Sequence, residues 1–182
     1  MAERVPRPML FANMVVLIGF GWLAILIALT PVDARASAAP APDLLFCVAA
    51  FLAIRRPRAT PAALVLILGL ARDLAGGGPV GLGALTLWAA VEYLRFHRER
   101  LLRSPAAELG FVAGAIIAMT LAQLGVLLVA LTPSPPLEVL GAGALATFAA
   151  YLITAGMLRY VFMIRPEAGE NLKLIGRAGR SR

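Results

Sequence analysis

Six apolar runs, separated by short segments rich in arginine, glycine or proline, constrain the fold of this chain more than any other feature. Several of them approach or exceed the roughly 20 residues that a helix needs to cross a bilayer. Only 15% of the 182 residues are charged, so a water-soluble particle of this composition would expose large apolar patches. The sequence predicts an all-α integral membrane protein with one transmembrane domain, residues 1–164, and a basic tail, residues 165–182. We expect six transmembrane helices over residues 9–30, 42–56, 60–75, 79–95, 106–132 and 137–164.

The basic residues predict how these helices are oriented. The chain has 16 Arg and one Lys, and they lie in short clusters between the apolar runs. If both termini are cytoplasmic, 15 of the 17 basic residues fall in cytoplasmic segments, and only Arg35 and Arg72 fall elsewhere. Short loops rich in arginine stay in the cytoplasm, so we expect both termini to be inside. The clustering also argues against nucleic acid as a partner, since no continuous basic face accompanies it.

The first apolar run has a second interpretation. It follows Arg4 and Arg7, and the small residues of the segment Ala34–Ala39 resemble the cleavage site of a secretory signal peptide. The apolar core of a signal peptide spans about 7–15 residues, whereas this run is longer and contains Trp22. The sequence therefore favours a retained helix over a cleaved signal.

The second and third helices are short, and charged residues lie at their ends. Each of the two segments, from Asp43 to Arg56 and from Thr60 to Asp73, spans 13 steps along the chain. At 1.5 Å per residue each helix is about 20 Å long. This length is less than the usual hydrocarbon thickness of a bilayer. We expect the two helices to form an antiparallel pair that turns at Arg55–Ala59, so that the two aspartates reach a similar depth near the outer face.

Arg72 reaches the same depth as Asp43 and Asp73. Ionisable residues at membrane depth are costly and usually find partners, so we expect Arg72 to pair with Asp43, Asp73 or both. Asp43 is also favoured by its place in the first turn of a helix, whereas Asp73 lies at a helix C-terminus. Three interpretations stay open: an anchor for the helix ends, a structural lock that shapes a binding surface, and a relay for protons or ions.

A glycine-rich segment joins the third and fourth helices. Gly77, Gly78, Pro79 and Gly81 predict a turn, because glycine permits positive φ angles and proline cannot continue a helix. A phosphate-binding loop would need a Gly-Lys-Ser/Thr ending, which this segment lacks. The segment therefore predicts close backbone packing between two helices and not nucleotide binding.

Several single residues predict contacts between helices. Gly110 and Gly114 are four residues apart, a spacing that lets another helix pack closely. Gln123 lies in the middle of a helix, where we expect it to bond a neighbouring helix. The single cysteine, Cys47, excludes an internal disulfide and is expected to be a small buried apolar residue.

The remaining polar residues give no support to catalysis. Glu92 and Glu108 flank a basic loop, and we expect both to pair there. The only histidine, His97, lies in that loop without metal-ligand spacing and is expected to be solvated. With no Ser/His/Asp or Cys/His set, we predict that the chain is not an enzyme and holds no metal or cofactor.

One stretch carries a family resemblance. Its residues are Pro42-Asp43-Leu44 at the start of the second helix, Arg55-Arg56-Pro57 at its end, and then Asp73-Leu74, Gly77, Gly78 and Pro79-Val80-Gly81. This pattern resembles the MreD family, the small rod shape-determining membrane proteins of bacteria. The likeness covers residues 42–85, and the rest of the chain agrees in helix number and hydropathy alone. Three consecutive glycines, Gly76–Gly78, stand where the family often has a bulkier residue.

The resemblance implies a non-enzymatic role in building side-wall peptidoglycan from the bacterial inner membrane. The implied partners are MreC, which has one membrane anchor, and through the complex MreB, RodA and a penicillin-binding transpeptidase. It also implies a fold like the substrate-binding subunits of energy-coupling-factor transporters. That fold supplies the alternative function, a subunit that binds a small, vitamin-like molecule for transport.

Overall fold

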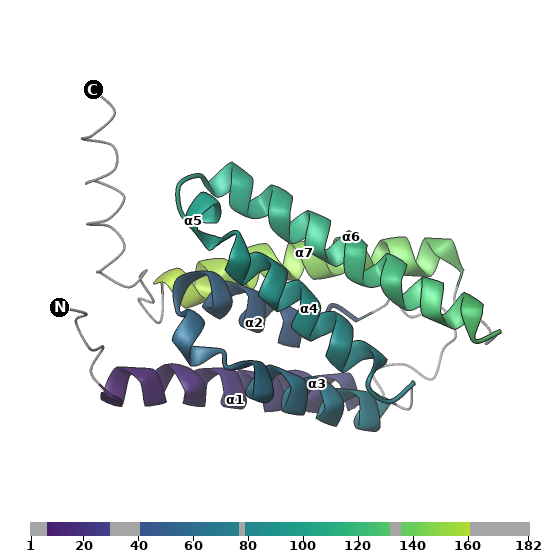
Figure 1. The fold of residues 1–182 in the computed structure, drawn as a ribbon, viewed down its shortest axis with the longest axis horizontal. Helices are drawn as coiled ribbons and strands as arrows, with labels where there is room; N and C mark the ends of the chain where they lie inside the picture. Colours follow the sequence, from purple (N-terminus) through teal and green to yellow (C-terminus); the bar gives the residue numbers. More distant parts are fainter. Residues whose placement is uncertain (1–6, 30–40, 77–78, 132–135, 161–182) are drawn as a thin grey trace.

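The computed structural model describes residues 7–29, 41–76, 79–131 and 136–160, and these residues form an all-α fold (Figure 1). The described part of the chain contains seven α-helices and one short 3-10 helix, η1. The elements are α1 (Arg7–Leu29), α2 (Leu44–Arg55), η1 (Pro57–Ala59), α3 (Ala62–Gly76), α4 (Leu82–Phe96), α5 (Arg98–Leu101), α6 (Pro105–Val129) and α7 (Leu137–Tyr160).

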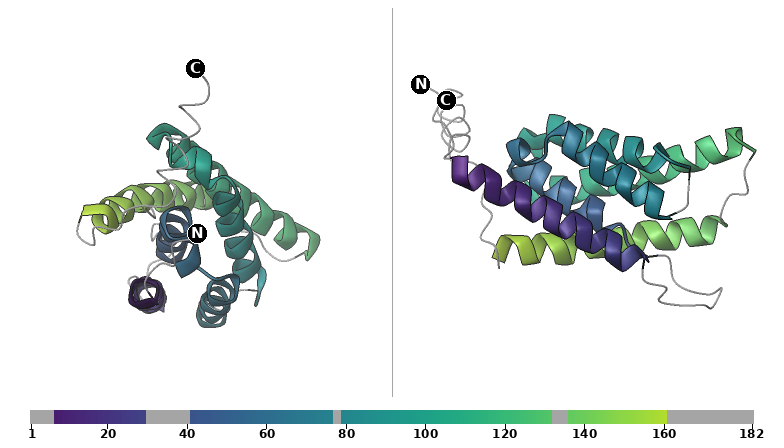
Figure 2. Two further views of the ribbon diagram at one scale, coloured as in Figure 1. Left: turned by 60° about the vertical axis from the view of Figure 1, so that its left-hand side comes forward. Right: turned by 90° about the horizontal axis from the view of Figure 1, so that it is seen from below.

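Helix α2 is the centre of the molecule. Every residue from Leu45 to Arg55 is buried, and α1, α4 and α7 pack around it (Figure 2). Its sequence is apolar on all sides, as expected for a helix that no solvent or lipid reaches. The 12 residues of α2 span about 18 Å, so this helix is too short to cross a bilayer unaided.

Two helices, α6 and α7, are long and apolar enough to cross a membrane. They have 25 and 24 residues, and most of each helix lies outside the core of the fold. Large apolar side chains on their outer faces are exposed, among them Leu121 and Ile153. Lipid is a solvent that tolerates such faces, so the two helices support membrane association.

The helices alternate in direction along the long axis of the bundle. The first residue of α1, the last of α2 and the last of α7 lie at one end, and α5 lies there too (Figure 1). We name this the Arg55 end, and we name the opposite end, where α2 begins and α4 starts at Leu82, the Asp43 end. The described basic clusters lie together at the Arg55 end. There Arg98 Nε donates to the Ile54 carbonyl at 3.3 Å.

Six described helices lie where the sequence predicted them, with described bounds within four residues of the predicted ones. Residues 30, 132 and 161–164 of the predicted helices and the predicted tail, 165–182, lie outside the described residues.

The second and third helices run antiparallel about a turn at η1, and Arg72 joins Asp43 and Asp73 at one end, as predicted. They pack little against each other, because α3 packs chiefly against α4 and α1. No described atom outside α6 lies within 4 Å of the point where a side chain would begin at Gly110 or Gly114, so these glycines mediate no packing inside the bundle. The short α5 was not predicted. Helix α1 packs against α2 and α3 and buries Leu17 completely, which supports a retained helix.

Candidate functional site

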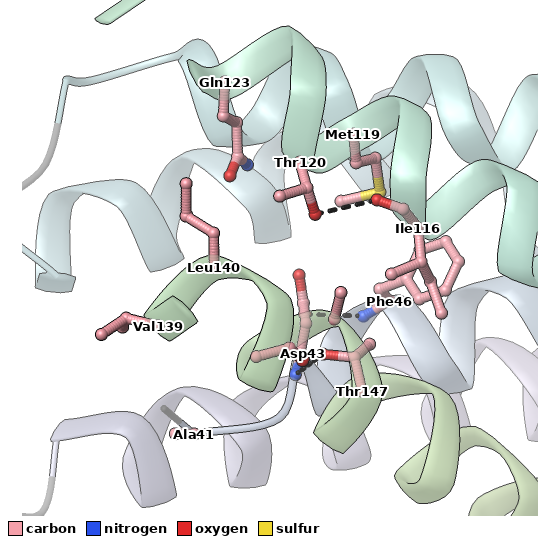
Figure 3. Close-up of a pocket in the computed structure, with 12 residues that line it drawn as sticks. Ala41, Asp43, Phe46, Ile116, Met119, Thr120, Gln123, Val139, Leu140 and Thr147 are labelled. Carbon is pink, nitrogen blue, oxygen red and sulfur yellow. Dashed lines mark hydrogen bonds between the residues drawn. The ribbon is translucent and has the colours of Figure 1, made fainter. Parts of the chain in front are cut away.

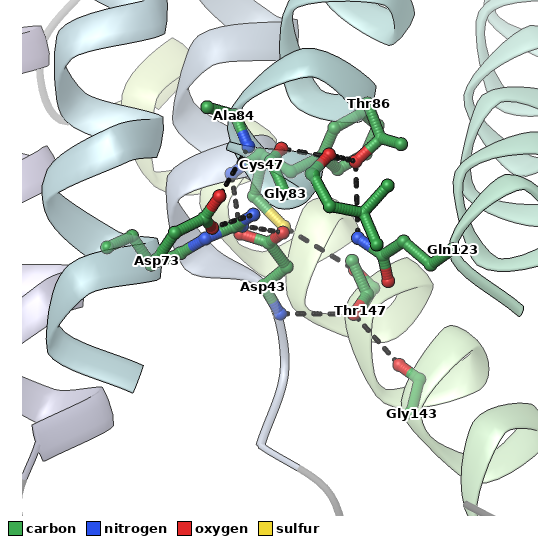
Figure 4. Close-up of polar contacts among 12 residues, drawn as sticks. Asp43, Cys47, Asp73, Gly83, Ala84, Thr86, Gln123, Gly143 and Thr147 are labelled. Atoms are coloured by element: carbon green, nitrogen blue, oxygen red, sulfur yellow. Dashed lines mark hydrogen bonds and ion pairs between the residues drawn. The ribbon is translucent and has the colours of Figure 1, made fainter. Parts of the chain in front are cut away.

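Asp43 begins α2 and connects three parts of the bundle. Its Oδ1 accepts a hydrogen bond from the Phe46 backbone N–H at 2.9 Å, the usual bond of a helix N-cap. Its Oδ2 accepts a hydrogen bond from Arg72 Nη1, so α3 is tied to the start of α2. Its own backbone N–H donates to Thr147 Oγ1 of α7 at 3.1 Å (Figure 4).

Asp73 joins the end of α3 to the start of α4. Its Oδ2 accepts hydrogen bonds from the backbone N–H groups of Gly81 at 3.0 Å and Ala84 at 2.9 Å. The sequence placed Asp73 at an unfavourable helix C-terminus, but the N-terminus of the next helix supplies its donors. Gly81 has a φ of 94°, a conformation that favours glycine, so the predicted turn is confirmed at this position.

Arg72 contacts both aspartates, as the charge pattern predicted. Besides its bond to Asp43, its Nη2 lies 3.6 Å from Asp73 Oδ1. Gly83 leaves room for these groups, since a Cβ there would clash with the Asp73 carboxylate and lie 2.6 Å from Arg72 Nη2. All four carboxylate oxygens therefore have partners, which favours the structural lock over the relay among the three interpretations.

The other residues of the predicted glycine segment contribute less. Pro79 is exposed, and Gly77 and Gly78 lie outside the described residues. The close packing that the glycines predicted occurs elsewhere, at Gly69, where a Cβ would lie 2.7 Å from Ala84 Cα. Helices α3 and α4 approach each other closely at this point.

Two cavities flank Asp43. The first, of about 190 Å³, lies between the start of α2 and helices α6 and α7 (Figure 3). The second, of about 300 Å³, lies on the side of Arg72, between α1 and the start of α2. Gln123 lines both cavities, and its Nε2 donates to Thr86 Oγ1 of α4 at 3.2 Å, so the predicted bond to a neighbouring helix is confirmed.

A second cluster of buried polar side chains, at the Arg55 end, was not predicted from the sequence. Arg55 Nη1 and Nη2 donate to the two carboxylate oxygens of Glu108 at 2.8 and 2.9 Å. Tyr151 Oη donates to Glu108 Oε1 at 2.6 Å, and the Arg55 guanidinium lies 4.2 Å from the centre of the Phe51 ring. We expected Glu108 to pair within its own basic loop, and this is wrong, because its partners come from α2 and α7.

Of the remaining predictions for single residues, those for Glu92 and Cys47 are confirmed and the one for His97 is wrong. Glu92 pairs with Arg95 at 2.9 Å, as predicted. Cys47 is fully buried, as predicted, and its Sγ lies 3.5 Å from the Thr147 carbonyl. His97 is not a freely solvated side chain, because its ring packs among Tyr93, Phe96 and Phe111 with centroid distances of 4.7 to 5.1 Å.

Within the described ranges no group of three or more His, Cys, Asp or Glu side chains is placed to hold a metal ion. Comparison of the chain with models of known protein families, with curated proteins and with solved structures finds no match.

Proposed function

We propose that the chain is a non-enzymatic, six-span membrane component of the bacterial machinery that elongates side-wall peptidoglycan. The observation that carries the proposal concerns the residues that resemble the MreD family. Asp43, Arg72, Asp73 and Gly81 contact one another through the bonds described above and form one unit at the Asp43 end. Three residues of the motif, Asp43, Asp73 and Gly81, are thus joined in one unit through Arg72. The Arg55-Arg56-Pro57 part of the motif lies at the opposite end of the bundle, and Gly77 and Gly78 lie outside the described residues.

The orientation of the chain follows from the same proposal. Helix α1 begins and α7 ends at the Arg55 end, where the described basic clusters also lie. Positive charge favours the cytoplasmic side, so the Arg55 end faces the cytoplasm and the Asp43 end faces outward. The short α2 is surrounded by longer helices, which shield its polar ends from lipid.

This orientation assigns surfaces to the proposed partners. The exposed apolar faces of α6 and α7 suit the single membrane anchor of MreC. The basic Arg55 end suits the cytoplasmic filaments of MreB. RodA and the penicillin-binding transpeptidase join through the same complex.

Depletion of the protein in a rod-shaped source bacterium tests this function. We expect depleted cells to become round, as judged by microscopy, and the native chain to restore rods. Arg72→Gln breaks the unit at the Asp43 end and is expected to restore rods poorly at equal membrane abundance. Glu138→Gln, which removes one charge from an exposed residue at the same end, is expected to restore them fully. Depleted cells that stay rod-shaped would contradict the proposal.

A second candidate is the small-molecule binding subunit of a membrane transporter. The two cavities beside Asp43 favour it, because a binding subunit needs such space at its outward end. Depleted cells that keep their shape but lose the uptake of one nutrient would support this candidate over the first.

A further inference from the structure

The cavity between α2, α6 and α7 has an apolar body and a polar end. Its volume of about 190 Å³ exceeds the roughly 150 Å³ of an engineered cavity that holds benzene. Apolar side chains form most of the wall, including Phe46, Ile116 and Met119. Oxygen atoms of Asp43, Thr120 and Gln123 also border the open space, with Thr120 and Gln123 on α6 and Asp43 across from them at the start of α2 (Figure 3). We call the part of the cavity between these oxygens its polar end.

The orientation of the Gln123 amide follows from its partner. The single hydroxyl hydrogen of Thr86 is directed at the carbonyl oxygens of Leu82 and Gly83, at 3.0 and 3.1 Å. Thr86 can therefore only accept from Gln123, and the amide must turn its NH₂ group toward Thr86. The Gln123 Oε1 atom is left to face the cavity as an acceptor.

The other oxygens at the polar end are acceptors for the same reason. Thr120 donates its hydroxyl hydrogen to the Ile116 carbonyl at 2.9 Å. Thr147 donates to the Gly143 carbonyl at 2.8 Å, and the Asp43 carboxylate carries no hydrogen to donate when ionised. The Asp43 oxygens already accept from the Phe46 N–H and Arg72, and the Thr147 hydroxyl accepts from the Asp43 N–H. The Thr120 and Gln123 oxygens remain as acceptors, and a guest that lacks a donor would leave them unpaired.

We propose that this cavity binds a primary amine carried on an apolar body of about the size of one aromatic ring. The acceptors at the polar end select a donor group, and the apolar wall selects the body. A cation is favoured over a neutral donor because two carboxylates, Asp43 and Asp73, share one guanidinium, that of Arg72. The proposal concerns the cavity alone and holds whether the chain serves wall synthesis or transport.

Calorimetric titration of the purified full chain in neutral maltoside micelles tests the proposal. The probes are phenethylamine, propylbenzene, in which a methyl group replaces the ammonium, and phenylacetate, which is an anion. We expect phenethylamine to bind about tenfold or more tightly than propylbenzene, and phenylacetate to bind least. Equal binding of the amine and propylbenzene, or no binding of the amine, would overturn the proposal.

Two sets of variants place the binding in this cavity. Ala144→Phe fills the cavity and should abolish binding of the amine. Ala149→Phe makes the same change at an exposed position of the same helix and should bind the amine normally. Thr120→Val combined with Gln123→Leu removes two acceptors, so the preference for the amine over propylbenzene should fall about tenfold. A preference that survives both changes in variants with native helix content would place the amine elsewhere and overturn the assignment.

Discussion

The two ends of α2 carry opposite charges in different surroundings. Asp43 stands at the N-terminus and Arg55 at the C-terminus, so each charge matches the helix dipole. At the Arg55 end the paired side chains of Arg55 and Glu108 are only 9% and 11% exposed. At the Asp43 end the side chains of Arg72 and Asp43 are 20% and 23% exposed, and cavities lie on both sides.

Similar ion pairs thus stand in different surroundings within one small fold. The Arg55 end is closed, with two direct bonds between guanidinium and carboxylate and a third from Tyr151. It fixes α2 against α6 and α7. At the Asp43 end, the contacts of Asp43, Arg72 and Asp73 connect α2, α3 and α4. Cavities lie beside the ion pair of Arg72 and Asp43. We therefore expect stability to depend mainly on the Arg55 end and function on the Asp43 end.

The largest effect is expected from Glu108→Ala. This change leaves the buried Arg55 guanidinium without its carboxylate, which should lower the free energy of unfolding by about 3–5 kcal/mol. Denaturant titration of the chain in mild detergent measures the loss. Glu138→Ala, at an exposed glutamate in the first turn of α7, is the matched control and should change little. Similar stabilities of the two variants would contradict the closed character of this end.

A smaller loss is expected from Tyr151→Phe. The phenol donates to an ionised carboxylate in a fully buried setting, so its removal should cost about 1.5–3 kcal/mol. The same denaturant titration applies. The exposed Tyr160→Phe supplies the control. In the double variant with Glu108→Ala the effect of Tyr151→Phe should shrink, because both changes remove the same bond.

At the Asp43 end, Asp43→Ala should destabilise more than Asp43→Asn. Asparagine still caps a helix, whereas alanine loses the bond to the Phe46 N–H, at a cost of about 1–2 kcal/mol. Thermal melting followed by circular dichroism measures both variants. If Asp43→Ala proved as damaging as Glu108→Ala, the two ends would be equivalent and the comparison would fail.

The smallest effects are expected from a pair of glycine substitutions with opposite signs. Gly83→Ala crowds the Asp73 carboxylate and Arg72 and should destabilise by about 1 kcal/mol. Gly110→Ala meets no neighbour within 4 Å and should stabilise α6 by up to about 1 kcal/mol. If Gly83→Ala and Gly110→Ala shifted the melting temperature in the same direction, the space around Gly83 would be larger than the structure shows.

Local signals in the sequence predicted the helices and much of the Asp43 end. Apolar runs end at charges, glycines or prolines, and these mark helix boundaries directly. Arg72 and Asp73 are neighbours in the chain, and Asp43 precedes an apolar run, so their roles could be inferred from position.

The Arg55 end was missed because it depends on how helices cross. Glu108 is 53 residues from Arg55 and 43 from Tyr151, and no sequence pattern links them. Gly110 and Gly114 of α6 contact no other described helix for a related reason. Their spacing permits close packing, but which face of α6 turns inward is set by the whole bundle.

The central claim is that the Asp43 end faces outward, the Arg55 end faces the cytoplasm, and α2 is enclosed between them. Labelling of introduced cysteines in intact and permeabilised cells tests this claim most directly. The reagent is a membrane-impermeant maleimide. We predict that Glu138→Cys is labelled in intact cells and Arg100→Cys only after permeabilisation. Cys47, fully buried in α2, should stay unlabelled in both. Labelling of Arg100→Cys in intact cells, or of Cys47 in the folded protein, would contradict the account.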